Sequence, residues 1–506
     1  MAARLAPVLT LFLAAFVLQT DAASATSCDG VRTMSLPNVT VTTATTLPAG
    51  PFQPVGIPAR PPVVLPAHCR VVVVLTPSAD SHIEMELWMP AENWNGKFEA
   101  VGNGGWAGVI SYAAMAQALN EGYATASTDT GHMGGDALFA IGHPEKLTDF
   151  AYRAVHEMTV TAKAIVTAFY GQAPRLSYFN GCSTGGRQGL MEAQKYPQDY
   201  DGIVAGAPAN NETHLGAWHM AVSAPIVRNP AAALTVAKLE IVHRAVLQAC
   251  DARDGVTDGL IDDPPRCAFD IGTLACRGGD ASDCLTADQV TSMRRVYGAA
   301  TLRDGTVVFP GKEFGSELGL GVSVGGGSLG IAAGDFQIAY GDPAWDIKTF
   351  DIDRDLPVAD AKVGIDDAID PDLRAFKAHG GKLLLYHGWN DQLIAPRNTI
   401  SYYESVRMKL GGTESDFIRL FMAPGMMHCG GGDGPNQFNP VSALERWREQ
   451  SIVPGEIIAV HVTNGVVDNT RPLCPYPEVA VYSGHGSTKD ALSFSCKTAP
   501  RIPALR

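Results

Sequence analysis

Hydrophobic and polar residues alternate over short stretches of the N-terminal part of the chain. In Ile83-Glu84-Met85-Glu86-Leu87 the apolar residues are separated by glutamates. A period of two is typical of a β-strand that buries one face. Prolines interrupt this region at Pro51, Pro54, Pro58, Pro61 and Pro62. The pattern therefore predicts antiparallel strands joined by turns.

From about Phe98 the pattern changes to short apolar runs, glycine turns and helical periodicity. A strand at Phe98–Val101 is followed by the turn Gly102–Gly105 and a helix near Ala113–Leu119. The same alternation continues with a helix at Phe150–Tyr170, strands at Leu176–Phe179 and Ile203–Ala207, and strands at Lys382–Tyr386 and Phe417–Met422. Strands that alternate with helices indicate a parallel sheet, so we expect an α/β fold.

The segment between about Ala209 and Asp367 interrupts this alternation. It contains four cysteines, acidic turns, a helical run at Val236–Gln248 and a glycine-rich stretch at Gly319–Gly334. The alternative, a long disordered loop, is disfavoured by the cysteines, the helical run and two tryptophans. We therefore predict a lid domain at residues 209–367, inserted between two parts of the core at 26–208 and 368–506.

The first residues have the pattern of a secretory signal peptide. Arg4 precedes an apolar run from Leu5 to Leu18, and Ala23-Ser24-Ala25 is a small-x-small cleavage pattern. A membrane anchor is the alternative, but the run is shorter than the roughly 20 residues that cross a bilayer. We expect residues 1–25 to be removed, with no membrane association afterwards. The mature protein would be secreted or periplasmic.

Composition and charge narrow the class of function. Of 506 residues, 46% are hydrophobic and 18% charged, which is typical of a soluble globular protein. Lys and Arg number 38 against 52 Asp and Glu, so the net charge is −14. That charge argues against nucleic acid as the main partner. All 10 cysteines follow the predicted cleavage point and would allow five disulfides.

One serine has the surroundings of a nucleophile. Ser183 lies in Gly181-Cys182-Ser183-Thr184-Gly185, a G-x-S-x-G match with a strand before it and a helix that we expect near Arg187. This context is required because a sharp strand-to-helix turn exposes the serine oxygen. Two further matches, around Ser323 and Ser328, lie in the glycine-rich stretch, where we expect a flexible loop instead.

An acid and a base follow Ser183 in the order that α/β-hydrolases use. Asp391 closes the run that begins with the strand Lys382–Tyr386, and His428 follows the strand Phe417–Met422. We interpret the nearer His387 as a structural residue. Cys182 directly precedes the serine and Cys429 directly follows the histidine. A disulfide between them would hold the nucleophile beside its base.

These residues resemble the tannase and feruloyl esterase family, which includes feruloyl esterases, tannases and MHETase-like hydrolases of terephthalate half-esters. The similarity is carried by three motifs, with weaker support from Gly102–Gly105 and Asp342–Asp346. The three motifs are Gly181-Cys182-Ser183-Thr184-Gly185-Gly186-Arg187-Gln188, His387-Gly388-Trp389-Asn390-Asp391 and Gly425-Met426-Met427-His428-Cys429. The resemblance covers essentially the whole mature chain and implies an α/β-hydrolase fold with a lid domain.

The resemblance also implies a reaction. Ser183 would attack an ester carbonyl, His428 would take its proton, and Asp391 would orient the imidazole. The backbone N–H of Thr184 and that of Gly104 or Gly105 would form the oxyanion hole. The substrate would be a small aromatic ester, most simply a feruloyl-type ester, with galloyl esters and a terephthalate half-ester as alternatives. A non-catalytic binding protein on the same fold is a more distant alternative.

The resemblance further implies a structural calcium ion in the lid and a disulfide pattern. The calcium ligands would be the carboxylates of Asp251, Asp254 and Asp258 and the backbone carbonyls of Val256 and Leu260. From composition alone, this segment would be a solvated acidic turn. We expect no organic cofactor, and the oligomeric state stays open. The implied disulfide pairs are Cys28–Cys69, Cys182–Cys429, Cys250–Cys267, Cys276–Cys284 and Cys474–Cys496.

Overall fold

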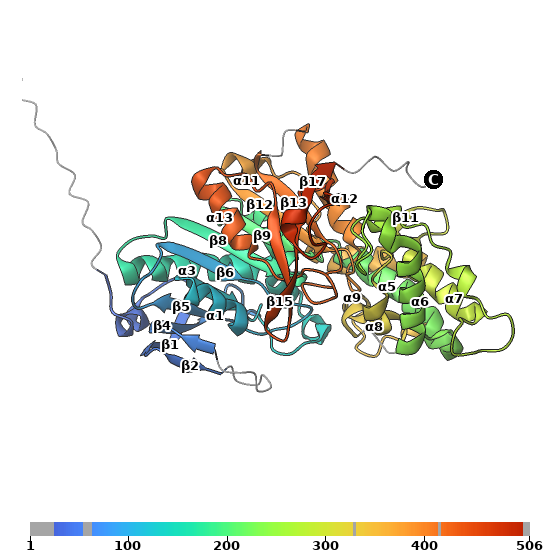
Figure 1. The fold of residues 1–506 in the computed structure, drawn as a ribbon. Helices are drawn as coiled ribbons and strands as arrows, with labels where there is room; N and C mark the ends of the chain where they lie inside the picture. The colour runs from blue at the N-terminus through green and yellow to red at the C-terminus, as the bar shows by residue number, and fades with distance from the viewer. Residues whose placement is uncertain (1–24, 54–62, 327–329, 413–415, 499–506) are drawn as a thin grey trace, which may run out of the picture.

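A nine-stranded mixed sheet forms the centre of the protein in a computed structural model, which describes residues 25–53, 63–326, 330–412 and 416–498 (Figure 1). The strand order is β1-β4-β5-β7-β6-β8-β9-β12-β13. Neighbours from β1 to β7 pair antiparallel, and neighbours from β7 to β13 pair parallel. The strands span Val39–Leu47 (β1), His68–Leu75 (β4), Ile83–Pro90 (β5), Lys97–Val101 (β6), Ala124–Thr128 (β7), Leu176–Cys182 (β8), Gly202–Gly206 (β9), Lys382–Gly388 (β12) and Ile418–Ala423 (β13).

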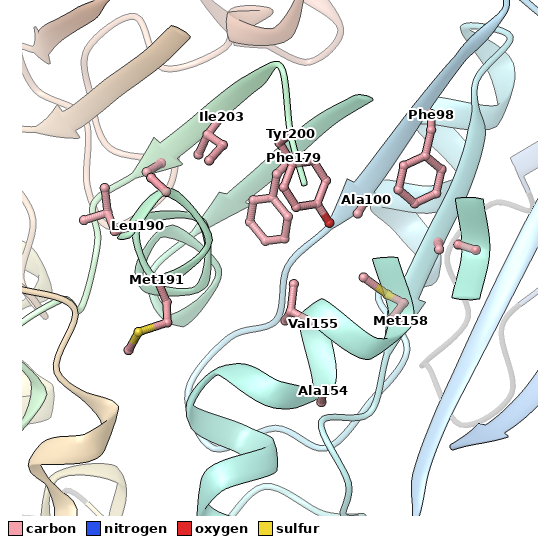
Figure 2. Close-up of a cluster of buried hydrophobic side chains, with 14 of the residues drawn as sticks. Phe98, Ala100, Ala154, Val155, Met158, Phe179, Leu190, Met191, Tyr200 and Ile203 are labelled. Carbon is pink, nitrogen blue, oxygen red and sulfur yellow. The ribbon is translucent and has the colours of Figure 1, made fainter. Parts of the chain in front are cut away.

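Helices cover both faces of this sheet, and the strands supply apolar side chains to each face in turn. On β12, Leu383 and Leu385 join one hydrophobic core, and Leu384 and Tyr386 join the core on the opposite face. This alternation follows from the two-residue period of a strand. Figure 2 shows the first core, where α3 and α4 pack against the sheet. The helices of the two faces are α3 (Ala154–Tyr170), α4 (Thr184–Lys195) and α12 (Pro396–Leu410) on the first, and α1 (Tyr112–Asn120) and α13 (Pro440–Gln450) on the second.

The inserted segment forms a second, largely helical layer with its own hydrophobic core, drawn in green and yellow at the side of the sheet (Figure 1). That core is built mainly from residues between Ala209 and Val363, together with Ile394 and Ala395. The helices are α5 (Glu212–Arg228), α6 (Val236–Cys250), α7 (Ala287–Tyr297), α8 (Gly321–Val324), α9 (Gly330–Tyr340) and α10 (Ile352–Val363). A small hairpin of β10 (Ala300–Thr301) and β11 (Val307–Phe309) accompanies them.

Short hairpins and helices complete the described chain. The C-terminal part holds two antiparallel hairpins, one of which, β14–β15, is drawn in red beside the sheet (Figure 1). Besides short 3₁₀ and π-helical turns, the remaining strands and helices of the described residues are β2 (Gly50–Phe52), β3 (Val63–Leu65), α2 (Pro144–Thr148), α11 (Arg374–Ala378), β14 (Ile457–Thr463), β15 (Val466–Leu473), β16 (Glu478–Tyr482) and β17 (Phe494–Thr498). Within the described residues, no helix is long and apolar enough to cross a bilayer.

Several element boundaries differ from those expected. β8 continues to Cys182 because Asn180, Gly181 and Cys182 still pair with β9. The predicted helix from Phe150 begins instead with a π-helical turn at Asp149–Arg153. This turn leaves the carbonyls of Phe150 and Ala151 free to accept hydrogen bonds from the buried Arg187 guanidinium.

The prediction of a flexible loop in the glycine-rich stretch 319–334 is wrong for the described part of that stretch. Ser323 lies on the short helix α8 and is only 2% exposed. Leu320 and Val324 pack into the core of the lid, which holds this helix in place. Ser328 and the predicted signal peptide, apart from Ala25, lie outside the described residues.

Candidate active site

Ser183 occupies the single-residue turn between β8 and α4. Its backbone has φ 64° and ψ −125°, a conformation that L-residues rarely adopt. The turn is fixed on both sides, since Ser183 N–H donates to Gly206 O (2.9 Å) and Ser183 O accepts from Arg187 N–H (3.0 Å). The helix begins at Thr184, three residues earlier than expected near Arg187. The serine therefore stands at the N-terminus of a helix, where developing negative charge is stabilised.

The glycines beside Ser183 are needed because backbones pass very close to one another. A Cβ atom on Gly181 would lie 2.5 Å from the carbonyl carbon of Gly185. One on Gly185 would lie 2.9 Å from Asn103 O, to which the Gly185 N–H donates. The G-x-S-x-G spacing therefore allows the turn after β8 to pack against the loop after β6.

Asp391 and His428 meet in the loops that follow β12 and β13, two neighbouring parallel strands. The distance between His428 Nδ1 and Asp391 Oδ2 is 2.7 Å. The other oxygen of Asp391 accepts the backbone N–H groups of Leu393 and Ile394, each at 2.8 Å. Asp391 is fully buried, which by itself would raise its pKa, but the neighbouring His428 and His387 hold the pKa well below its usual range.

Two contacts of Asp391 and His428 were not predicted from the sequence. His387, interpreted as a structural residue, is buried and bonded through Nδ1 to Thr399 Oγ1, but its Nε2 also lies 3.0 Å from Asp391 Oδ2. Gln392 Oε1 accepts the backbone N–H of His428 at 3.1 Å. The His387-Gly388-Trp389-Asn390-Asp391 motif places a histidine four residues before the acid, and this spacing was the available signal.

The disulfide Cys182–Cys429 joins the serine turn to the histidine loop, as expected. The Cα atoms of the two cysteines are 6.0 Å apart, so the neighbouring Ser183 and His428 are held close together across 247 residues of sequence. The other four expected pairs are also confirmed, and the described residues contain no free cysteine. These pairs are Cys28–Cys69, Cys250–Cys267, Cys276–Cys284 and Cys474–Cys496.

A cavity of about 300 Å³ opens above Ser183 and His428, between the core and the lid. The core side contributes Gly104, Gly105 and Thr184, the three residues expected around the oxyanion. As the first residue of α4, Thr184 has no intrahelical acceptor for its N–H. Its hydroxyl donates to Gly105 O (3.0 Å), which joins the two expected oxyanion segments.

The lid side of this cavity is mostly apolar and contains groups that the sequence did not reveal. It is lined by Ala209, Leu215, Gly216, Ile331 and Ala332, with Glu212 and His219 as its polar residues. Burial, and then the charge of Asp366, raise the pKa of Glu212 to about 8, so the carboxyl is protonated at neutral pH. A larger cavity of about 580 Å³ beside the C-terminal hairpins contains none of these residues.

The predicted calcium segment forms a compact acidic loop after α6. Each of the carboxylates of Asp251, Asp254 and Asp258 accepts backbone N–H groups of the loop. Asp262 is 4% exposed, and its Oδ1 has no hydrogen-bond partner among the described residues. Arg471 on β15 forms ion pairs with Asp258 and Asp262. This one guanidinium cannot balance the charge of the four carboxylates of Asp251, Asp254, Asp258 and Asp262. An unpartnered buried carboxylate oxygen in an all-oxygen donor set fits a hard cation such as Ca²⁺.

The chain is similar to known proteins along most of its length. The family model for tannase and feruloyl esterase matches residues 69–325 and 331–497. The chain belongs to the tannase and feruloyl esterase family. An uncharacterised esterase of Xanthomonas campestris pv. campestris is 37% identical over 96% of this chain and 93% of its own length. A probable feruloyl esterase B-2 of Aspergillus terreus is 35% identical over 97% and 98%.

The fold of this family member is shared with a solved relative. The crystal structure of feruloyl esterase B from Aspergillus oryzae superposes with a TM-score of 0.87, at 32% identity over 92% of this chain and 98% of that one. The chain is therefore a carboxylic-ester hydrolase with the α/β-hydrolase fold.

Proposed function

We propose that this esterase hydrolyses esters of hydroxycinnamic-type aromatic acids, as a feruloyl esterase. The observation that carries the proposal is the apolar cavity lined by both Ser183 and His428, whose neighbours Cys182 and Cys429 form a disulfide. The chain is also similar along nearly its whole length to proteins named feruloyl esterases. A planar aromatic acyl group suits the apolar lid side of this cavity. Galloyl esters and a terephthalate half-ester are the alternative substrates.

In this proposal, Ser183 is the nucleophile, His428 the general base and Asp391 the acid that orients the imidazole. His428 takes the hydroxyl proton as Ser183 attacks the ester carbonyl, and it returns the proton to the leaving alcohol. Water then releases the acid from the acyl-enzyme by the same route. The 2.7 Å contact between His428 Nδ1 and Asp391 supports this assignment, because it leaves Nε2 as the nitrogen for the serine.

The oxyanion of the tetrahedral intermediate would be stabilised by backbone N–H groups. Thr184 N–H is the first donor, since it follows the nucleophile at the helix N-terminus. The second donor is the N–H of Gly104 or Gly105, which lie on the core side of the same cavity. Donors that are already oriented stabilise the charge without reorganisation during the reaction.

We also propose that the acidic loop binds a structural calcium ion through Asp251, Asp254 and Asp258 and the carbonyls of Val256 and Leu260. Calcium would supply positive charge to a loop with an excess of carboxylates. Export to the periplasm or the medium is supported by the predicted signal peptide and by five disulfides, which persist in oxidising compartments.

The test is a hydrolysis panel of methyl ferulate, methyl gallate and the terephthalate half-ester, measured with the wild type and Ser183→Ala. We expect methyl ferulate to give the highest kcat/KM, and Ser183→Ala to lower kcat about 10⁴-fold or more, because only the oxyanion hole and binding remain. Ser323→Ala, at another G-x-S-x-G serine, is the matched control and should change kcat little. Activity of Ser183→Ala within about tenfold of the wild type, or no hydrolysis of any of the three esters, would overturn the proposal.

A further inference from the structure

Three ligand-type side chains come together between α3, α4 and the turn before β9. They are His156 on α3, Glu192 on α4 and Asp199 in the turn. One donor atom from each side chain lies within 4.8 Å of the donor atoms of the other two. His156 Nδ1 and Asp199 Oδ2 are 2.6 Å apart. This cluster is separate from the candidate active site and from the acidic loop after α6.

Glu192 is the unusual member of the cluster. It is only 1% exposed, and neither of its carboxylate oxygens has a hydrogen-bond donor among the described residues. The nearby Lys163 ammonium donates to the backbone carbonyl of Asp199 and makes no ion pair with Glu192 within the described part of the chain. Buried carboxylates are normally paired or coordinated to a metal, because desolvation of an unpaired charge is very costly.

The other two ligands are oriented and accessible. The His156 ring stacks on Tyr196 with 3.7 Å between ring centroids and 8° between planes, which fixes the direction of its nitrogens. The side chains of His156 and Asp199 are 27% and 14% exposed. An ion could therefore enter from solvent and meet the buried Glu192 last.

We propose that His156, Glu192 and Asp199 form a site for a divalent transition-metal ion, with Zn²⁺ as the best match. One imidazole nitrogen and two carboxylate oxygens are donors that Zn²⁺ accepts, and water would complete a tetrahedron. Ligand atoms of a tetrahedral zinc site lie about 3.3 Å apart, so the cluster would need only small side-chain movements.

The position of the cluster, away from Ser183, gives the metal a structural role. Glu192 lies eight residues after Thr184 on α4, about 12 Å along the helix axis from the nucleophile turn. Asp199 precedes the start of β9, whereas Ser183 contacts its end at Gly206. The ion would join two helices that otherwise share the apolar contacts of Val155, Met158, Leu190 and Met191 (Figure 2).

A proton shared between Glu192 and Asp199 is the competing explanation for the buried carboxyl group of Glu192. Burial, and then the approach of the Asp199 carboxylate, raise the pKa of Glu192 well above its usual range, so a protonated Glu192 could donate to Asp199. The two explanations differ in the effect of Glu192→Gln. The amide can replace the protonated acid as a hydrogen-bond donor, but it is a poor ligand for zinc.

The experiment uses the full mature protein, stripped with a nitrogen-donor chelator that binds Zn²⁺ and leaves Ca²⁺, then dialysed against Zn²⁺. We expect about one zinc per chain by elemental analysis and a melting temperature raised by Zn²⁺. Glu192→Gln and His156→Ala should each lose the zinc and the shift. Glu157→Gln, one residue further along α3, is the matched control and should retain both.

Esterase activity provides the check on folding, because the cluster lies away from Ser183. A variant that has wild-type activity but no zinc supports the proposal. If Glu192→Gln binds zinc as the wild type does, or if the stripped wild type takes up no zinc and its melting temperature ignores the ion, the metal site is wrong. The second variant keeps the test decisive should Glu192→Gln fail to fold, since His156 is partly exposed and its truncation disturbs the core less.

Discussion

At the scale of single residues, Asp391 combines full burial with a charge. His428 and His387 both contact its Oδ2, and their electrostatic and hydrogen-bond interactions outweigh the burial that would otherwise raise its pKa. We expect Asp391→Asn to lower kcat about 10⁴-fold at neutral pH, because an amide neither fixes the imidazole tautomer nor stabilises the imidazolium. The measurement is steady-state hydrolysis of methyl ferulate. A loss below tenfold would mean that Asp391 does not orient the base.

The carboxyl group of Glu212 leads us to predict a pH dependence of KM. Its pKa of about 8 lies above the ordinary 4.5, so it is neutral in the cavity below pH 8 and charged above that pH. A carboxylate among apolar lining residues disfavours an aromatic group, and KM for methyl ferulate should therefore rise as pH increases through about 8. Glu212→Gln should remove this rise. The control is Glu84→Gln, at an exposed position of β5, which should keep the wild-type pH profile.

At the scale of elements, the Cys182–Cys429 bridge holds β8 and the loop after β13 in one arrangement. It closes a loop across 247 residues, for which chain entropy alone gives a stabilisation of about 5 kcal/mol. We expect Cys182→Ala with Cys429→Ala to lower kcat about 10²-fold in the folded fraction, because small displacements of reacting groups have effects of that size.

The matched control for that variant removes Cys276–Cys284, a bridge across 8 residues in the lid. Its loss should leave kcat nearly unchanged, measured on the folded fraction with methyl ferulate. Equal effects of the two double variants on kcat would show that the bridge beside Ser183 stabilises the fold without positioning the nucleophile.

The elements also show which features the sequence could predict. The period of two in residues 83–87 and the apolar runs of β9 and β12 predicted the sheet, because burial on one or both faces leaves a local pattern. The five disulfides followed from the resemblance to the family. Helix α9 and the π-helical turn at Asp149–Arg153 were missed, because each depends on packing against segments far apart in the chain. The contact of His387 with Asp391 was missed although only four residues separate them, because it depends on the course of the backbone after β12.

At the scale of the whole molecule, the lid and the core meet in the loop that carries the acid. Asp391 lies within the loop between β12 and α12, and Ile394 and Ala395 of the same loop pack into the hydrophobic core of the lid. The same two N–H groups that hold Asp391 Oδ1, those of Leu393 and Ile394, therefore depend on lid packing. Changes in lid stability should for this reason reach the active site through this loop.

The acidic loop after α6 is a second link between distant parts of the chain, because Arg471 of β15 pairs there with Asp258 and Asp262. If calcium binds this loop only in the folded protein, a hundredfold excess over its Kd stabilises the fold by about 3 kcal/mol. A calcium chelator should then lower the melting temperature of the wild type, and added Ca²⁺ should restore it. The melting temperature of Asp254→Asn should be the same with chelator as with Ca²⁺. Since the loop does not contact Ser183, kcat at low temperature should change little. A wild-type melting curve that is indifferent to both chelator and Ca²⁺ would remove the calcium site and leave the loop with its ion pairs to Arg471.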